Sequence, residues 1–155
     1  MGVRVLLPFP LSAHAAGYTL DDYALLDVRR LGDKMPTPGK SEESDQILFV
    51  NWVHRTFPDA WPFLHHSPNG KRRSASDGQK LKLMGVRAGF PDLFLPWPVG
   101  DYMGCVIELK LGKGRATAEQ KKWIDHFVKC GYAARVLTLS EAQTFFSEYM
   151  NGDIG

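Results

Sequence analysis

The sequence has few cysteines, no long apolar run, no internal repeat and no low-complexity tract. Its two cysteines, Cys105 and Cys130, each lie in apolar sequence and lack the paired spacing of a zinc site or a disulfide framework. We therefore expect the protein to be located in a reducing cytoplasm. No stretch approaches the roughly 18 apolar residues that a membrane-spanning helix needs, and we expect no membrane partner. A chain of 155 residues can bury one hydrophobic core but is too short for two domains of ordinary size, so we expect one main domain.

The start of the chain only faintly resembles a secretory signal. Arg4 precedes an apolar run, but Pro8 and Pro10 interrupt it, and the run is already at the short limit for a signal. We expect residues 1–40 to be an extension of unassigned role, with a short helix over 19–31 and a linker over 32–40. The main domain is expected over 41–151.

The net charge of +2 hides an uneven distribution of charge. Residues 66–122 hold eleven Lys and Arg against five Asp and Glu, whereas each flank carries a net charge of −2. A basic middle segment is expected of a surface that binds nucleic-acid phosphates, although an ordinary solvated surface can have the same composition. The residues expected to contact nucleic acid are Asn69, Lys71, Arg72, Arg73, Lys80, Lys82, Arg87, Lys113 and Arg115.

Apolar spacing and caps predict an α/β domain whose mixed central sheet is flanked by α-helices. The expected elements are a helix over 41–57, an extended segment over 61–66, a helix over 76–84, strands over 92–95 and 102–110, a helix opened by the capping box of Thr117 and Gln120, a strand over 132–139, and a last helix capped by Ser140. The buried face of the first helix is expected to carry Ile47, Val50, Val53 and Phe57. We expect His54, His65 and His66 to be half-buried structural residues.

Asp92, Glu108 and Lys110 form the pattern that carries chemistry. Side chains alternate along a strand, so Glu108 and Lys110 should face one way, and an antiparallel hairpin would bring Asp92 near Glu108. Two such carboxylates repel each other unless a cation lies between them, and Mg²⁺ suits because it takes oxygen ligands and keeps several waters. Lys110 could then orient or help deprotonate the attacking water.

Several motifs, in order, resemble the VRR-NUC family. The resemblance covers roughly 42–150, more than two thirds of the chain. The segments that carry it are 42–46, 66–70 followed by Arg73, 82–93, 107–110, Gln120, Gly131 and Tyr132.

The resemblance implies the restriction-endonuclease-like fold of the PD-(D/E)xK nucleases. It implies metal binding by Asp92, Glu108, the carbonyl of Leu109 and Glu42, with Mg²⁺ as the cofactor and Mn²⁺ able to replace it. Lys110 would be the catalytic lysine, and Gln120 would line the catalytic site. Stand-alone members, many from bacteriophages, resemble the nuclease module of the Fanconi-associated nuclease. Several are homodimers that cut branched DNA such as Holliday junctions, which for a phage protein would take place in the bacterial host cytoplasm.

Other interpretations of the same residues stay open at the level of the sequence. Glu42 would stabilise the first turn of any helix, and Gln120 is accounted for by its capping box. The protein could be a catalytically silent DNA-binding module, a restriction-type nuclease that reads a short sequence, or a partner-binding protein. Against the silent module, three carboxylates within a basic face would weaken phosphate binding unless a metal were present.

Overall fold

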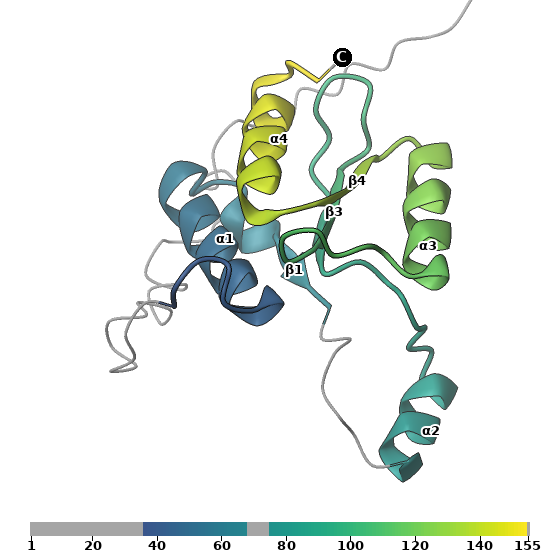
Figure 1. The fold of residues 1–155 in the computed structure, drawn as a ribbon. Helices are drawn as coiled ribbons and strands as arrows, with labels where there is room; N and C mark the ends of the chain where they lie inside the picture. The colour runs from purple at the N-terminus through teal and green to yellow at the C-terminus, as the bar shows by residue number, and fades with distance from the viewer. Residues whose placement is uncertain (1–35, 68–74, 155) are drawn as a thin grey trace, which may run out of the picture.

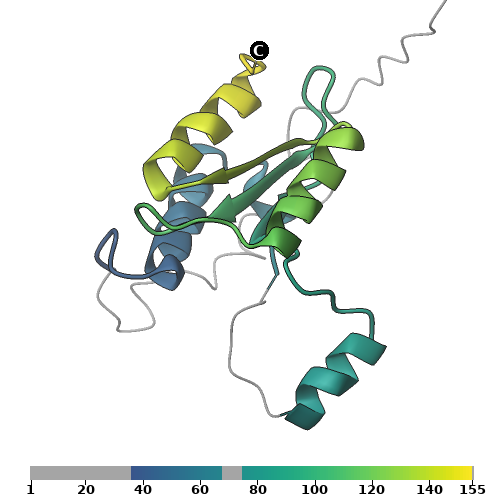
Figure 2. The ribbon, with the colours of Figure 1, turned by 45° about the vertical axis from the view of Figure 1, so that its right-hand side comes forward.

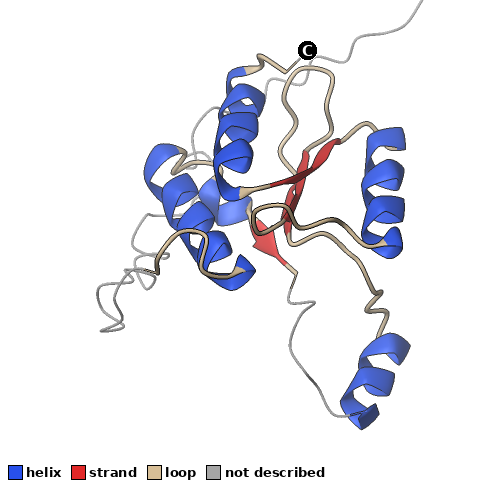
Figure 3. Ribbon diagram, viewed as in Figure 1, coloured by secondary structure: helices blue, strands red, loops and turns tan. Residues whose placement is uncertain are grey.

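A four-stranded mixed sheet lies at the centre of the structure, a computed structural model that describes residues 36–67 and 75–154. The strands lie in the order β1-β2-β3-β4; β1 pairs with β2 and β2 with β3 antiparallel, and β3 pairs with β4 parallel. Figure 3 shows helices around this sheet, as predicted for the α/β class. In chain order the elements are α1 (Glu42–Thr56), the 3-10 helix η4 (Trp61–Phe63), β1 (His65–His66), α2 (Ala75–Leu83), β2 (Leu93–Leu95), β3 (Cys105–Leu109), α3 (Ala118–Lys129), β4 (Ala133–Leu137) and α4 (Leu139–Asn151).

The helices divide between the two faces of the sheet. α1 and α4 lie on one side and α3 lies on the other, and the views in Figures 1 and 2 both show this arrangement. The parallel pair β3–β4 needs a crossover connection, and α3 supplies it. α2 lies apart from the sheet, on the connection between β1 and β2.

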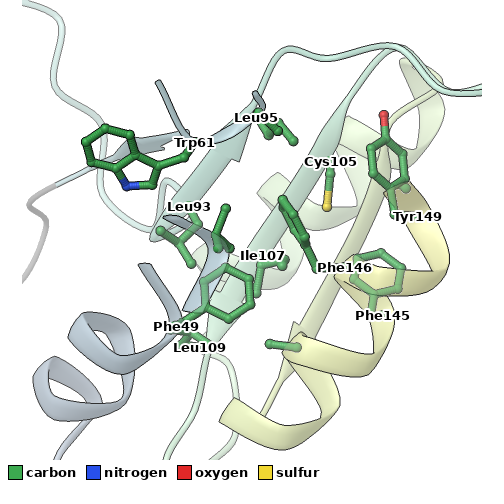
Figure 4. Packing of buried hydrophobic residues seen from close by; sticks show 14 residues of the cluster. Phe49, Trp61, Leu93, Leu95, Cys105, Ile107, Leu109, Phe145, Phe146 and Tyr149 are labelled. Carbon is green, nitrogen blue, oxygen red and sulfur yellow. The ribbon is translucent and has the colours of Figure 1, made fainter. Parts of the chain in front are cut away.

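β3 is one of the two inner strands of the sheet and is buried along its whole length. Its residues alternate as predicted: Ile107 and Leu109 belong to the core beneath α1 and α4, whereas Val106 packs in a smaller cluster on the α3 side. In the larger core the rings of Phe49 and Phe146 meet edge to face at 5.6 Å (Figure 4). Glu108 comes two residues after Val106 in the strand, so its side chain also faces the α3 side.

Two predicted features of the helices and turns are wrong in detail. The segment 61–66 is not extended throughout, because Pro62 at the start of η4 favours a helical turn, and only His65–His66 forms a strand. The last helix is capped by Thr138 and not by Ser140. The N–H and hydroxyl of Thr138 both donate to Glu141 Oε2, at 2.8 and 2.7 Å.

The predicted buried face of α1 is also partly wrong. Phe49 and Val53 are fully buried, whereas Ile47 is 39% exposed. Two residues along a helix turn the side chain by about 200°, so burial of Phe49 forces Ile47 toward solvent. His65 and His66 are exposed rather than half-buried; the ring of His54 packs on Trp61.

The predicted helix over 19–31 and the basic loop over 71–73 lie outside the described residues. Among those described, no helix is long and apolar enough to cross a membrane.

Substitutions in α1 test this helix register. Phe49→Ala leaves a cavity in the core and is expected to lower the free energy of unfolding by about 3–5 kcal/mol. Ile47→Ala, on the same helix, should lower it by less than about 1 kcal/mol because the site is partly solvated. Urea denaturation measures both, and equal losses would contradict the register.

Candidate active site

The predicted site residues come together where β2 begins and β3 ends. The hairpin between the strands pairs Leu93 with Ile107, so the preceding residue, Asp92, comes beside Glu108. The N–H of Leu109 donates to Asp92 Oδ2 at 3.0 Å, which fixes the aspartate at the strand end. The predicted juxtaposition of Asp92 and Glu108 is therefore present.

Lys110 links β3 to α1 through two carboxylates. Its Nζ lies 2.7 Å from Glu108 Oε1 and 3.4 Å from Glu42 Oε1. Lys110 and Glu108 are 9% and 1% exposed, whereas the Glu42 side chain is about half exposed. An ion pair that is this well buried stands in a weakly screened environment, so it fixes the positions of both groups.

Gln120 brings α3 to the same carboxylate. Its N–H donates to Thr117 Oγ1 at 3.3 Å, and its side-chain oxygen accepts from the N–H of Thr117 at 2.9 Å, which is the predicted capping box. The side-chain amide then donates to Glu108 Oε1. Gln120 thus caps the helix and also contacts Glu108, whereas its place in a catalytic site stays a prediction.

We refer to Glu42, Asp92, Glu108, Lys110 and Gln120 as the carboxylate–lysine cluster. Its second glutamate oxygen, Glu108 Oε2, is buried and has no hydrogen-bond partner within the described part of the chain. A buried carboxylate oxygen without a donor is unfavourable unless a cation or a proton neutralises it.

The cluster offers a few carboxylate oxygens, which are the ligands that a hard cation such as Mg²⁺ prefers. Glu108 Oε2 and the Asp92 carboxylate supply oxygen donors, and Mg²⁺ in proteins is commonly held by one or two carboxylates with waters completing an octahedron. No set of three or more His, Cys, Asp or Glu side chains in residues 36–67 and 75–154 is arranged around a common metal position. Glu42 was predicted as a further ligand, but its carboxylate lies against Lys110.

Burial shapes the protonation of this cluster. It raises the pKa of Glu108 to about 7, against the opposing effect of the hydrogen bond from Lys110. Burial likewise raises the pKa of Asp92, although the Leu109 N–H opposes it. For Lys110, burial lowers the pKa, but the hydrogen bond and charge of Glu108, together with Glu42, outweigh it and keep the pKa above its usual value. Lys110 is therefore an ammonium at neutral pH.

Sequence reasoning missed the position of His66. Its exposed ring places Nδ1 3.0 Å from the carbonyl oxygen of Asp92, and the Ser67 N–H donates to the same oxygen at 3.0 Å. β1 thus helps to fix the backbone at Asp92. The only signal in the sequence was that His66 opens the segment 66–70.

The basic residues predicted to bind nucleic acid that the structure describes come from two parts of the fold. Lys80 and Lys82 are exposed on α2, away from the sheet, and Lys113 and Arg115 are exposed between β3 and α3. Arg87 is exposed on the loop after α2 and donates from Nη1 to the carbonyl oxygen of Lys82 at 3.0 Å. The predicted contacts Asn69, Lys71, Arg72 and Arg73 lie outside the described residues.

A family model for the VRR-NUC domain matches residues 41–141, about two thirds of the chain. The chain belongs to the VRR-NUC family. It is also similar to a solved structure described as a VRR_NUC domain protein, with 32% sequence identity and a TM-score of 0.64; the match covers 74% of this chain and 92% of that one. None of the curated proteins matches the chain.

The match confirms the resemblance found in the sequence and the fold class that it implied. VRR-NUC proteins form a nuclease family, and the whole carboxylate–lysine cluster falls within the matched residues. The roles of its individual residues remain predictions.

Gly89 lies in the loop before Asp92 and packs closely against the start of α3, where Gln120 lies. Its φ is +75°, and a Cβ atom there would lie 2.6 Å from Glu119 Cβ and 2.8 Å from the backbone nitrogen of Gln120. Only glycine allows the loop before Asp92 to lie this close to the start of α3.

Gly89→Ala therefore introduces both backbone strain and a clash. We expect it to lower the free energy of unfolding by at least about 2 kcal/mol. Gly100→Ala is the matched control, because Gly100 has a φ of +58° with open space around its Cβ position, so it should cost only about 1–2 kcal/mol. If the two variants lose equal stability in urea denaturation, the loop does not press on α3.

The raised pKa of Glu108 predicts the pH dependence of stability without metal. The folded state keeps a proton on Glu108 up to about pH 7, whereas an exposed glutamate loses it near 4.5. Because the folded state binds this proton more tightly, Glu108 contributes to the free energy of unfolding in full below pH 4.5, and the contribution is lost as pH rises through 7. The raised pKa of Asp92 changes the free energy of unfolding in the same direction. In EDTA we expect stability to fall by on the order of 1–3 kcal/mol from pH 5 to pH 8. Glu108→Gln should flatten this fall, and an unchanged profile would contradict the assignment.

Proposed function

We propose that this VRR-NUC protein is a Mg²⁺-dependent endonuclease that hydrolyses phosphodiester bonds in DNA, with Mn²⁺ able to replace Mg²⁺. The observation that carries the proposal is Glu108 Oε2, which is buried and has no hydrogen-bond partner among the described residues. The strand register sets Glu108 beside Asp92, and the same cluster holds a buried ammonium. A merely structural ion pair would not need a carboxylate oxygen left without a donor. Asp92, Glu108 and the carbonyl of Leu109 would hold the metal.

The cation, when bound, would supply Lewis acidity at the phosphoryl oxygen and make water nucleophilic near neutral pH. It would also compensate the charge of Asp92, which is half-buried, and of Glu108, which is buried; burial raises the pKa of both carboxyl groups. The Leu109 N–H holds Asp92, and the Gln120 amide holds Glu108, so neither carboxylate has to reorganise during the reaction.

Lys110 is proposed to act as a donor and not as a base. Its pKa is held above the usual value by its carboxylate partners, so it keeps its proton at neutral pH. Because its Nζ touches Glu108 Oε1, the ammonium stands beside the proposed metal position. There it can orient the attacking water and offset the charge that develops on the phosphate. Glu42 positions this ammonium from the other side.

For the substrate, we propose branched DNA such as Holliday junctions, cut by a homodimer. The described part of one chain offers a single carboxylate–lysine cluster, so symmetric cutting of two strands by this cluster needs a second copy. The nuclease character of the family supports DNA as the substrate class; the preference for branches and the dimer rest on the resemblance alone.

Cleavage assays test the proposal directly. Labelled linear, flap and four-way-junction DNA are incubated with the protein in Mg²⁺, Mn²⁺ or EDTA. We expect cleavage only with metal, fastest on the junction, and a loss of at least about 100-fold in Asp92→Asn because the charged metal donor is removed. Asp101→Asn is the control, since Asp101 is exposed in the turn between β2 and β3, at the far end of the hairpin.

Two results would contradict the proposal at different points. Undiminished cleavage in EDTA would contradict the metal dependence. Wild-type cleavage rates for Asp92→Asn would contradict the assignment of the site. Equal rates on linear and branched DNA would refute only the substrate preference. Size measurement by light scattering would test the dimer independently.

A further inference from the structure

A hollow separate from the carboxylate–lysine cluster lies between α3 and the loop that follows α2. Its volume is about 390 Å³, within the range of small-ligand sites. It is lined by Arg87, Ala88, Glu119, Lys122, Trp123 and His126. We call it the Trp123 hollow.

The walls of the Trp123 hollow are held in place by contacts on both sides. The indole N–H of Trp123 donates to the Ala88 carbonyl at 3.1 Å, and the Phe90 ring meets the indole edge to face at 5.0 Å. The close approach of Gly89 to α3 fixes the same loop from beneath. The hollow is therefore formed before any ligand arrives.

The lining combines an aromatic ring with cations. Trp123 is half-buried, so part of its surface faces the hollow, and His126 stands nearly perpendicular to it at 6.1 Å. Lys122 and Arg87 are exposed at the rim. Arg87 uses Nη1 on backbone carbonyls, but a guanidinium carries five N–H donors, and the others can serve a ligand.

An unpaired nucleotide matches this lining better than duplex DNA does. Single-stranded nucleic acid is bound by aromatic side chains on which bases stack and by cations that follow the backbone. A duplex phosphate would need the cations but would leave the ring and the concave shape unused. Glu119 adds an acceptor of the kind that pairs with the exocyclic amino group of a base.

The Trp123 hollow and the proposed catalytic site share the first turns of α3. Gln120, which contacts Glu108, is next to Glu119 in α3. Lys122 and Trp123 follow within one turn of Gln120, which is about 5 Å along the helix axis. A strand whose phosphate lies at the cluster can therefore place a neighbouring nucleotide in the hollow.

We propose that the Trp123 hollow binds one unpaired nucleotide of the DNA substrate, with its base on Trp123 and its phosphate at Arg87 and Lys122. This inference rests on the proposed nuclease function and deepens it. It gives a physical basis for selecting DNA with an unpaired flank or an opened branch point.

The test measures binding in EDTA, where no cleavage occurs. Two labelled DNAs of the same duplex sequence are compared by fluorescence anisotropy, one blunt and one with a short single-stranded flank. Trp123→Leu keeps an apolar side chain but removes the stacking surface, and it should weaken binding of the flanked DNA about tenfold or more. Binding of the blunt duplex should change by less than about twofold.

Lys122→Ala, at an exposed position that tolerates truncation, is the second variant. It should weaken binding of the flanked DNA about fivefold and flatten its salt dependence. Lys121→Ala is the matched control, because Lys121 is exposed on the same helix but does not line the hollow. It should affect both DNAs equally and slightly.

The outcomes separate this inference from the proposed function. Equal losses on blunt and flanked DNA, or a Lys121→Ala effect as large as that of Lys122→Ala, would overturn the hollow as a nucleotide site. Wild-type cleavage in Mg²⁺, measured in parallel, reports on the nuclease proposal alone. Selective loss on flanked DNA without any cleavage by the wild type would support the hollow and refute the nuclease.

Discussion

The structure depends on the compensation of one buried carboxylate. Glu108 lies near the end of the inner strand β3 with only 1% of its surface exposed, and a charge in such a place needs partners or a proton. Lys110, which directly follows the strand, and Gln120 from α3 both donate to its Oε1, and Lys110 also contacts Glu42 on α1. This chain of contacts ties β3 to helices on both faces of the sheet. Among the described residues the chain of contacts stops at Oε2, which has no hydrogen-bond partner, and the proposed cation would neutralise that oxygen.

Much of this could be predicted because it depends on local geometry. Strand alternation placed Ile107 and Leu109 in the core and Glu108 on the opposite face, and the hairpin connection brought Asp92 beside Glu108 with no long-range information. The caps at Ser41 and Thr117 were visible as residue types at the correct spacing before apolar runs. The order of motifs also identified the family before any geometry was known.

What the sequence could not predict depends on packing between distant segments. Phe49 and Ile47 are both apolar, and packing against distant core residues such as Phe146 decides which of them is buried. The approach of Glu42 to Lys110 joins residues 68 apart in the chain, so α1 had to be placed before the partner of Glu42 could be known. The Trp123 hollow likewise needs two segments that no motif connects. Its tryptophan looks from the sequence like any core position of an amphipathic helix.

The place of α2 has a consequence for how such a protein can diversify. β1 and β2 are direct neighbours in the sheet, yet the connection between them carries a helix that lies apart from the rest of the fold (Figures 1 and 2). A connection of this kind can lengthen, shorten or be replaced at small entropic cost, because closure grows only slowly with loop length. Selection could therefore rebuild the surface that α2 offers to other molecules while the sheet and its buried charges stay the same. The fold in this way separates a part that can evolve quickly from a part that cannot.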